Sequence, residues 1–246
     1  MIALSARGIR AVLLDIEGTT TPIAFVHDVL FPYARARLKT FLERRRRSED
    51  VARAVALLAS EHGQETPREP PPPWPDRVPE DIDAVAGYAA WLMDRNRKST
   101  GLKLLQGYIW EDGYRAGELR GQVFADVAPA IRRWRDAGRQ VAIYSSGSEL
   151  AQRRLFESTA DGDLTHLLSG FFDTTIGSKK ASESYARIAS TLGVRPPETM
   201  FVSDVPDELA AARSAGLAVV LSIRPGNPPL AADVDYERIE TFDDLI

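Results

Sequence analysis

Short apolar runs alternate with amphipathic segments through the second half of this chain. The runs are only a few residues long, which is typical of strands buried on both faces; they span 141–144, 200–203 and 218–223, and we place a further short strand at 172–176. Between them, apolar residues recur every three or four positions, which indicates helices; these span 127–137, 148–158, 184–192 and 207–215. Alternation of this kind predicts an α/β fold with a doubly wound, Rossmann-like parallel sheet.

The first strand is separated from this alternating region. Residues 9–16 are apolar on both faces and predict a central, parallel strand. Helical periodicity then continues without another strand; the expected helices span 25–47, 49–61, 81–97 and 102–114. We therefore predict a core domain formed by residues 1–21 and 121–246, with a helical cap inserted at 22–120.

Two local compositions stand out in the helical block. Four consecutive prolines, Pro70 to Pro73, lie within the proline-rich run 67–75 and exclude a helix or a central strand, so we expect extended polyproline II. We interpret this run as a rigid surface loop; the alternative is a ligand for a domain that binds proline-rich segments. The four arginines at 44–47 are best explained as a solvated helix C-terminus, with a phosphate or nucleic-acid contact as the alternative.

Composition narrows the functional class. The chain has 246 residues, 44% hydrophobic and 27% charged, as in an ordinary globular protein. Its net charge of −4 favours neither a nucleic-acid partner nor an anionic membrane surface. It contains no cysteine, which excludes disulfides and thiol catalysis and fits a reducing cytoplasm. We see neither a signal peptide at 1–10 nor a membrane-spanning apolar run, and expect a cytoplasmic protein.

Polar side chains follow the predicted strands. In an open parallel sheet, ligands bind beyond the carboxyl ends of the strands, so residues at these positions are expected to meet at one edge. They are Asp15 and Glu17, Ser145 and Ser146, Lys179 or Lys180, and Asp204 with Asp207 and Glu208. Each motif alone has an ordinary explanation as a helix cap or a surface charge. The coherent order of all four favours a functional site.

This set of residue types suits phosphate chemistry. Ser145 and Ser146, with backbone N–H groups at a helix N-terminus, supply hydrogen-bond donors for phosphate oxygens, and a lysine supplies positive charge. Asp15 and Asp204 are hard oxygen ligands of the kind Mg²⁺ prefers. Asp15 is therefore a candidate nucleophile that forms an aspartyl-phosphate. Glu17 is in reach to protonate the leaving oxygen and then to activate water.

The order of motifs resembles the haloacid-dehalogenase superfamily of phosphatases over nearly the whole chain. The resemblance rests on DIEGT at 15–19, on a strand ending in Ser145, on Lys179, and on Asp204 with Glu208. The inserted helical block stands where that superfamily carries a cap. Glu17 departs from the usual aspartate of the first motif and points to a narrower family. DIEGTTTPI at 15–23, LQGYIW at 105–110, IYSSGS at 143–148 and RPGN at 224–227 resemble the enolase-phosphatases of methionine salvage.

That resemblance implies a bifunctional reaction on a phosphorylated small molecule. The substrate would be 2,3-diketo-5-methylthiopentyl-1-phosphate, which is enolised and then dephosphorylated. The implied Mg²⁺ site comprises Asp15, Glu17 and Asp204, where Glu17 contributes its backbone carbonyl. Ser145, Ser146 and Lys179 would hold the substrate and its phosphate, with Lys180 as the competing lysine and Glu208 in support. The resemblance also implies a monomer.

Two other functions are compatible with these motifs. One is a different Mg²⁺-dependent small-molecule phosphatase of the same superfamily. Another is a receiver-like phospho-aspartate switch, although receivers lack a large helical insertion after the phosphoacceptor strand. The base for enolisation is unassigned, since His27 on a helix is more often structural. Gln106, Tyr108 and Trp110 are candidates for the substrate tail, with packing inside the cap as the alternative.

Overall fold

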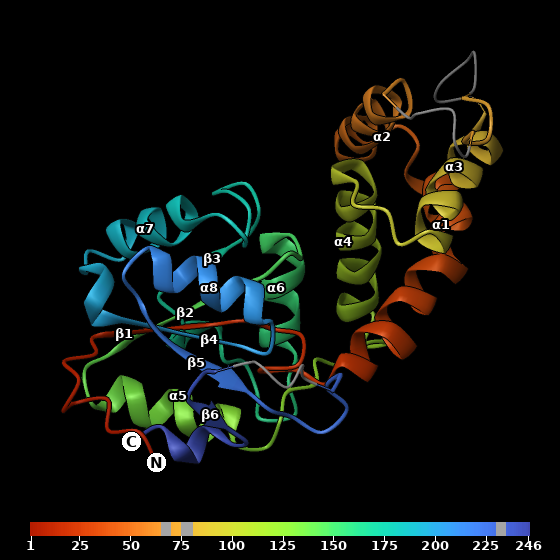
Figure 1. Ribbon diagram of the computed structural model, residues 1–246. Helices are drawn as coiled ribbons and strands as arrows, with labels where there is room; N and C mark the ends of the chain where they lie inside the picture. The colour runs from red at the N-terminus through yellow and green to blue at the C-terminus, as the bar shows by residue number, and fades with distance from the viewer. Residues whose placement is uncertain (65–69, 75–80, 230–234) are drawn as a thin grey trace. The chain divides into compact units, whose positions relative to one another are not determined.

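The chain folds into two compact units (Figure 1). The computed structural model describes residues 1–64, 70–74, 81–229 and 235–246. One unit, called here the core unit, comprises Met1–Val26 and Arg120–Ile246. The other, the helical unit, comprises His27–Leu119.

A parallel sheet forms the centre of the core unit. Its described strands lie in the order β3-β2-β1-β4-β5-β6. They are β1 (Ala11–Leu14), β2 (Gln140–Tyr144), β3 (Gly170–Phe172), β4 (Thr199–Ser203), β5 (Ala218–Ser222) and β6 (Arg238–Ile239). β1 pairs in parallel with β2 on one side and with β4 on the other, and all four of its residues are buried. The predicted doubly wound parallel fold and the central place of its first strand are confirmed, since this strand order is the Rossmann-like one.

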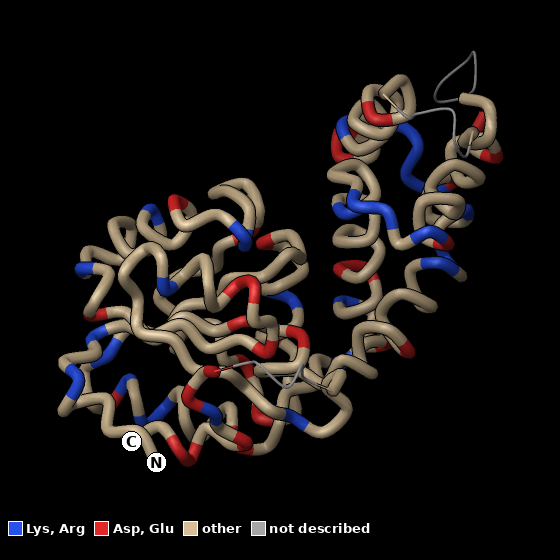
Figure 2. Tube along the Cα trace, viewed as in Figure 1, with Lys and Arg blue, Asp and Glu red and all other residues tan. Residues whose placement is uncertain are grey.

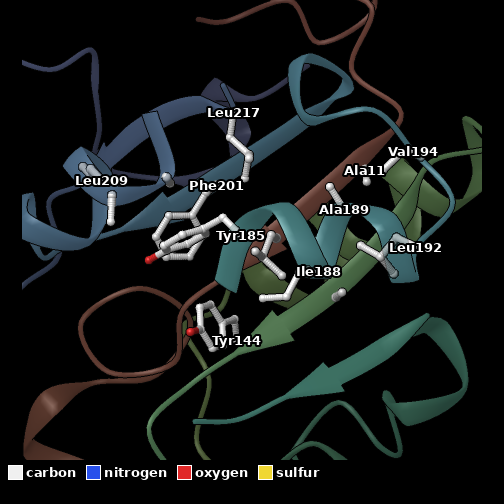
Figure 3. Close-up of a cluster of buried hydrophobic side chains, with 14 of the residues drawn as sticks. Ala11, Tyr144, Tyr185, Ile188, Ala189, Leu192, Val194, Phe201, Leu209 and Leu217 are labelled. Carbon is white, nitrogen blue, oxygen red and sulfur yellow. The ribbon is translucent and has the colours of Figure 1, made fainter. Parts of the chain in front are cut away.

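Helices cover both faces of this sheet. They are α5 (Val127–Asp136), α6 (Glu149–Glu157), α7 (Ser182–Thr191) and α8 (Pro206–Ser214), with 3₁₀ turns η2 (Thr165–Leu167), η3 (Pro196–Glu198) and η4 (Phe242–Asp244). α7 and α8 bury a cluster that includes Tyr185, Ile188 and Leu209 against the sheet (Figure 3). On the opposite face, Phe156 of α6 packs on Phe171 of β3. The winding reverses direction at β1, and in such sheets ligands bind beyond the carboxyl ends of the strands near this reversal.

β1 is shorter at both ends than the predicted 9–16, and β3 and β6 differ more from the prediction. The third strand was expected at 172–176, but β3 is Gly170–Phe172. The chain turns after Phe172 because the Asp173 carboxylate accepts a hydrogen bond from the Thr175 N–H at 2.8 Å, which bends the backbone out of the sheet. β6 was not predicted, since two residues give no periodic signal.

The helical unit contains the helices expected before the alternating region. They are α1 (Phe31–Arg45), which follows a π-helical turn η1 (Phe25–Leu30), α2 (Glu49–His62), α3 (Ile82–Asp94) and α4 (Thr100–Arg115). Ser48, Asp81 and Ser99 cap the last three by accepting backbone N–H bonds. α2 and α4 approach closely at Gly101, where a side chain would come within 3.0 Å of α2 backbone.

The two unusual compositions lie on the surface of the helical unit. Arg44 and Arg45 both form ion pairs with Asp112. The described part of the proline run, residues 70–74, has neither helix nor strand. The Pro72 carbonyl oxygen lies 2.9 Å from Nε2 of His62, and the Trp74 ring contacts His62 and Tyr88. Residues 67–69 and 75 of the predicted run lie outside the described residues. Within the described ranges, no helix combines the length and apolar character needed to cross a membrane.

Candidate active site

A tight turn after β1 holds the first acidic residue at the sheet edge. The N–H groups of Thr19, Thr20 and Thr21 all point to the carbonyl oxygen of Ile16, at 2.9 to 3.2 Å. The Thr20 hydroxyl also donates to the carbonyl of Asp15 at 3.0 Å. The turn leaves the Asp15 side chain 6% exposed, where its Oδ1 accepts the Ile16 N–H at 2.7 Å. The carboxylate is therefore held in place by its own loop.

Glycine at position 18 is required by both conformation and space. Gly18 has φ of 65°, in the left-handed region that disfavours side chains. A Cβ there would also lie closer than 3.0 Å to the Asp204 carboxylate and the Asn227 side-chain oxygen. Because Gly18 leaves that space open, the carboxylate that follows β4 can lie directly against the loop that follows β1. The glycine of the first motif thus brings Asp15 and Asp204 to one place.

Lys179 is buried between two carboxylates. Its Nζ lies 2.6 Å from Oδ1 of Asp15 and 2.6 Å from Oε2 of Glu208. The Ser203 hydroxyl, at the end of β4, joins the same two acids at 3.2 and 3.0 Å. Lys180, by contrast, is exposed and pairs with Asp207 on the surface. Of the two candidate lysines, the structure brings Lys179 to the acidic residues.

The site carries more negative than positive charge. Burial and the neighbouring Asp15 carboxylate raise the pKa of Asp204 to about 7. The same two causes raise the pKa of Glu208 to about 7, although Lys179 lies beside it. Burial alone would lower the pKa of Lys179, but the charges of Asp15 and Glu208 raise it. Both pKa values rise, so Lys179 keeps its proton and Glu208 binds one more readily, because one ammonium group cannot neutralise several buried acids. Figure 2 shows acidic positions gathered at this end of the sheet.

A divalent cation fits this donor set. Asp15 and Asp204 offer carboxylate oxygens from adjacent strands, and the surplus negative charge around them favours a cation. Glu17 is exposed in the same turn, and its negative charge makes a smaller contribution to the raised pKa of Asp204. No group of three or more acidic or histidine side chains forms a metal cluster in the described part of the chain. Mg²⁺ commonly uses one or two carboxylates and keeps several waters, and Asp15 and Asp204 supply two carboxylates.

The two predicted serines follow the strand next to β1. Ser145 is buried at the end of β2, and its hydroxyl accepts the Gly147 N–H at 3.2 Å. Ser146 is exposed. Ser148 accepts the Ala151 N–H and caps α6, so the N-terminus of that helix opens directly after the serines. Since β2 is parallel to β1, both serines lie at the edge that carries Asp15.

Sequence reasoning did not identify the supports beneath the first loop. The Arg224 guanidinium is buried between the rings of Phe124 and Phe242. It donates to the carbonyl of Thr19 at 3.0 Å and to Asp126 at 2.8 Å. Asn227 donates to the carbonyl of Gly18 at 3.0 Å. The RPGN string at 224–227 was the available signal, but it gave no role to either side chain.

Comparison with known proteins adds independent information. The family model described as haloacid dehalogenase-like hydrolase matches residues 9–216. The "Enolase-phosphatase E1" of Synechococcus elongatus is 50% identical over 237 residues, which cover 96% of this chain and 98% of that protein. A Vitis vinifera protein named "Probable bifunctional methylthioribulose-1-phosphate dehydratase/enolase-phosphatase E1 1" is 43% identical over 96% of this chain and 47% of its own length. Among solved structures, the Unknown transcript 4 protein of Saccharomyces cerevisiae has a TM-score of 0.75 and 32% identity, covering 96% of this chain and 99% of that one.

Proposed function

Because this chain belongs to the enolase-phosphatase E1 family of haloacid dehalogenase-like hydrolases, we propose that it enolises and then dephosphorylates 2,3-diketo-5-methylthiopentyl-1-phosphate. The product is 1,2-dihydroxy-3-keto-5-methylthiopentene, an intermediate of L-methionine salvage. The name of the Vitis vinifera relative supports this substrate class, since it joins an enolase-phosphatase to a methylthioribulose-1-phosphate dehydratase.

The observation that carries the phosphatase half is the contact of Lys179 with Asp15. The Lys179 ammonium group lies 2.6 Å from an Asp15 oxygen, and a carboxylate is the nucleophile that phosphoryl transfer to an aspartate requires. In the proposed first step, an Asp15 oxygen forms a bond to phosphorus while the bond from phosphorus to the substrate oxygen breaks. The chain then carries an aspartyl-phosphate, and the leaving oxygen takes a proton.

Glu17 is proposed to supply and recover that proton. Its side chain is exposed at the rim of the turn, where it can exchange protons with the substrate oxygen and with solvent. In the second step Glu17 takes a proton from water, the water oxygen bonds to phosphorus, and the bond to Asp15 breaks. Phosphate leaves and the Asp15 carboxylate is restored, so the cycle closes with no net change in the protein.

The remaining residues are proposed to bind the phosphate and the metal. Ser145, Ser146 and the N–H groups at the start of α6 donate hydrogen bonds to phosphate oxygens, and Lys179 offsets their charge. Asp15, Asp204 and the backbone carbonyl of Glu17 would hold Mg²⁺. When bound, Mg²⁺ supplies the positive charge that allows a carboxylate to approach a phosphate dianion.

A coupled assay tests this proposal. The diketo phosphate is added to the protein with and without Mg²⁺, and the ultraviolet absorbance of the enol is recorded together with phosphate release. The proposal expects the enol signal to precede phosphate, with both depending on Mg²⁺. Phosphate release from many simple phosphate esters without an enol signal would instead indicate a general phosphatase. A stable aspartyl-phosphate without turnover would indicate a phospho-aspartate switch.

We further propose that the protein acts as a cytoplasmic monomer. The absence of cysteine suits a reducing compartment, and the family resemblance supports the monomeric state. Light scattering after size-exclusion chromatography checks the monomer against the chain mass of 27.1 kDa. A mass near twice that value would contradict it.

A further inference from the structure

The loop that carries Lys179 has an unusual backbone. Gly177 adopts φ of 142°, which a residue with a side chain rarely does. A Cβ at this position would also lie closer than 3.0 Å to the Ser184 hydroxyl. The loop therefore lies against the first turn of α7 with no space between them, although residues 177–179 belong to no helix or strand.

Three side-chain hydroxyls hold three successive carbonyl groups of this loop. Tyr144, the last residue of β2, donates to Gly177 at 3.0 Å. Ser184 of α7 donates to the carbonyl of Ser178 at 2.8 Å. Tyr185, next in α7, donates to the carbonyl of Lys179 at 2.7 Å. Tyr144, Ser184 and Tyr185 are here called the hydroxyl clamp.

The clamp is well suited to hold a fixed geometry. All three side chains are at most 2% exposed, so their hydrogen bonds do not compete with water. Burial raises the pKa of Tyr144 and of Tyr185, which keeps both phenols protonated as donors. Bonds to successive carbonyls fix successive peptide planes, and this sets the direction in which the Lys179 side chain leaves the backbone.

The ammonium group at the end of that side chain needs such control. Lysine has a flexible stem with several rotatable bonds and acts as a point charge, so its placement depends on the backbone that carries it. Its Nζ lies 2.6 Å from Asp15 and from Glu208, and a small shift of the loop would change both distances. Misplacement of a reacting or binding group by about 1 Å can cost up to ~10²-fold in rate.

We propose that Tyr144, Ser184 and Tyr185 are positioning residues for phosphoryl transfer, which fix the Lys179 ammonium group where it meets both Asp15 and the substrate phosphate. This inference rests on the proposed phosphatase function. It assigns to the two tyrosines and the serine a role beyond filling the core between α7 and the sheet.

Removal of single hydroxyls tests the clamp. Tyr185→Phe and Ser184→Ala each delete one donor and almost no volume, and the pair deletes two. We expect each single variant to lower kcat/KM by about tenfold and the pair by up to ~10²-fold. Inhibition by inorganic phosphate should weaken by a similar factor, because Lys179 holds that ligand directly.

Two controls match these changes. Tyr114→Phe removes another buried phenol hydroxyl, one without a hydrogen-bond partner among the described residues. Ser190→Ala removes an exposed hydroxyl from α7 itself. Both are expected to keep the wild-type kcat/KM and the wild-type inhibition constant for phosphate.

The outcomes separate the clamp from the function on which it rests. Clamp variants that keep the wild-type kcat/KM and phosphate inhibition, measured well below their thermal transitions, would overturn the proposal even if their melting temperatures fall. If the pair does not fold, the single variants decide on the same two measurements. An inactive wild-type protein, or full activity in Lys179→Ala, would instead refute the proposed function.

Discussion

Two buried cations contact the same loop of the core unit, one at each end of it. Lys179 bonds the carboxylate of Asp15, at the start of the loop. Arg224 bonds the carbonyl of Thr19, near its end. Both side chains are at most 6% exposed; Lys179 also pairs with Glu208, and Arg224 also pairs with Asp126. Position and burial alone do not distinguish them.

Their partners do distinguish them. Lys179 is a point charge that bonds two ionisable side chains, and it can transfer its interaction to an arriving phosphate. Arg224 is a planar group between two aromatic rings, and two of its acceptors are backbone carbonyls, those of Thr19 and Glu240. Its contacts therefore tie it to the backbone and to the aromatic core around it. We therefore expect Lys179 to serve the chemistry and Arg224 to serve the shape of the loop.

The largest expected effect concerns the residue on which the chemistry depends. Asp15→Asn removes the proposed carboxylate nucleophile while keeping the size of the side chain. We expect phosphate release to fall by about 10⁴-fold or more, with the circular dichroism spectrum unchanged. Wild-type-like turnover in this variant would show that Asp15 is not the nucleophile and that the contact with Lys179 is structural.

Arg224→Met should have the next largest effect, which we expect in the free energy of unfolding. It leaves the Asp126 carboxylate without its cation and the Thr19 carbonyl without its donor, which typically costs about 3–5 kcal/mol. Urea denaturation measures the free energy of unfolding. Arg132→Met, at an exposed arginine, is the matched control and should change it by less than about 0.5 kcal/mol. If Arg224→Met and Arg132→Met were equally stable, Arg224 would not support the loop, and its contrast with Lys179 would fail.

Lys179→Ala should affect activity more than stability, in contrast to Arg224→Met. We expect kcat/KM to fall by about 10²–10³-fold, because a preorganised charge is lost from the phosphate site. The free energy of unfolding should fall by less than in Arg224→Met, since Glu208 can take up a proton near neutral pH and relieve the buried charge. Lys180→Ala, which removes only the surface pair with Asp207, is the control and should keep full activity.

The ion pair between Asp126 and Arg224 should make the free energy of unfolding depend on pH. Burial alone would raise the pKa of Asp126, but hydrogen bonds from the Phe242 N–H and from Arg224 hold it below its ordinary value of 3.8. Its contribution to stability is therefore present above pH 3.8 and lost as the pH falls further. We expect Asp126→Asn to destabilise the protein by about 1.5–3 kcal/mol at pH 7. The difference from wild type should narrow in urea titrations below pH 4, and a constant difference would contradict the pairing.

Glu17→Asp should show the smallest effect. Our hypothesis is that the additional methylene of Glu17 gives reach for a bulkier, enolisable substrate. The shorter side chain should then lower kcat/KM on the diketo phosphate by several-fold, about 1 kcal/mol, and leave stability unchanged. Simple phosphate esters should be affected less. Full activity of Glu17→Asp on the diketo substrate would refute the hypothesis.

The comparison also shows what the sequence can and cannot predict. Asp15, Lys179 and Asp204 could be found because each follows a strand, and parallel strands end at one edge. Lys180 was separated from its neighbour only by family spacing, and the structure places it on the surface. The roles of these residues stay predictions. β3 was placed too late along the chain because the aromatic and β-branched residues of 172–176 favour a strand, while the turn at Asp173 depends on one side-chain hydrogen bond.

Arg224 and Ser203 could not have been predicted in the same way. A single arginine in a sequence is most often a surface residue, and a serine at a strand end is most often a cap. What makes them different is a partner far away in the sequence: Thr19 for Arg224 and Asp15 for Ser203. Local periodicity carries no information about such pairs. The hydroxyl clamp was missed for the same reason, because Tyr144 reads only as the apolar end of a strand.

The central place of β1 has a consequence for the order in which the molecule is made. β1 leaves the ribosome before both of its neighbours, yet its apolar residues have no sheet to join until β2 and β4 are synthesised. The helical unit is one continuous segment, so it can fold before β1 has a strand to pair with. The turn around Gly18 gains its last support only with Asn227, 209 residues later. The first motif to be translated is thus among the last to reach its final shape, and a nascent chain stopped before β4 would expose an apolar strand to chaperones or to aggregation.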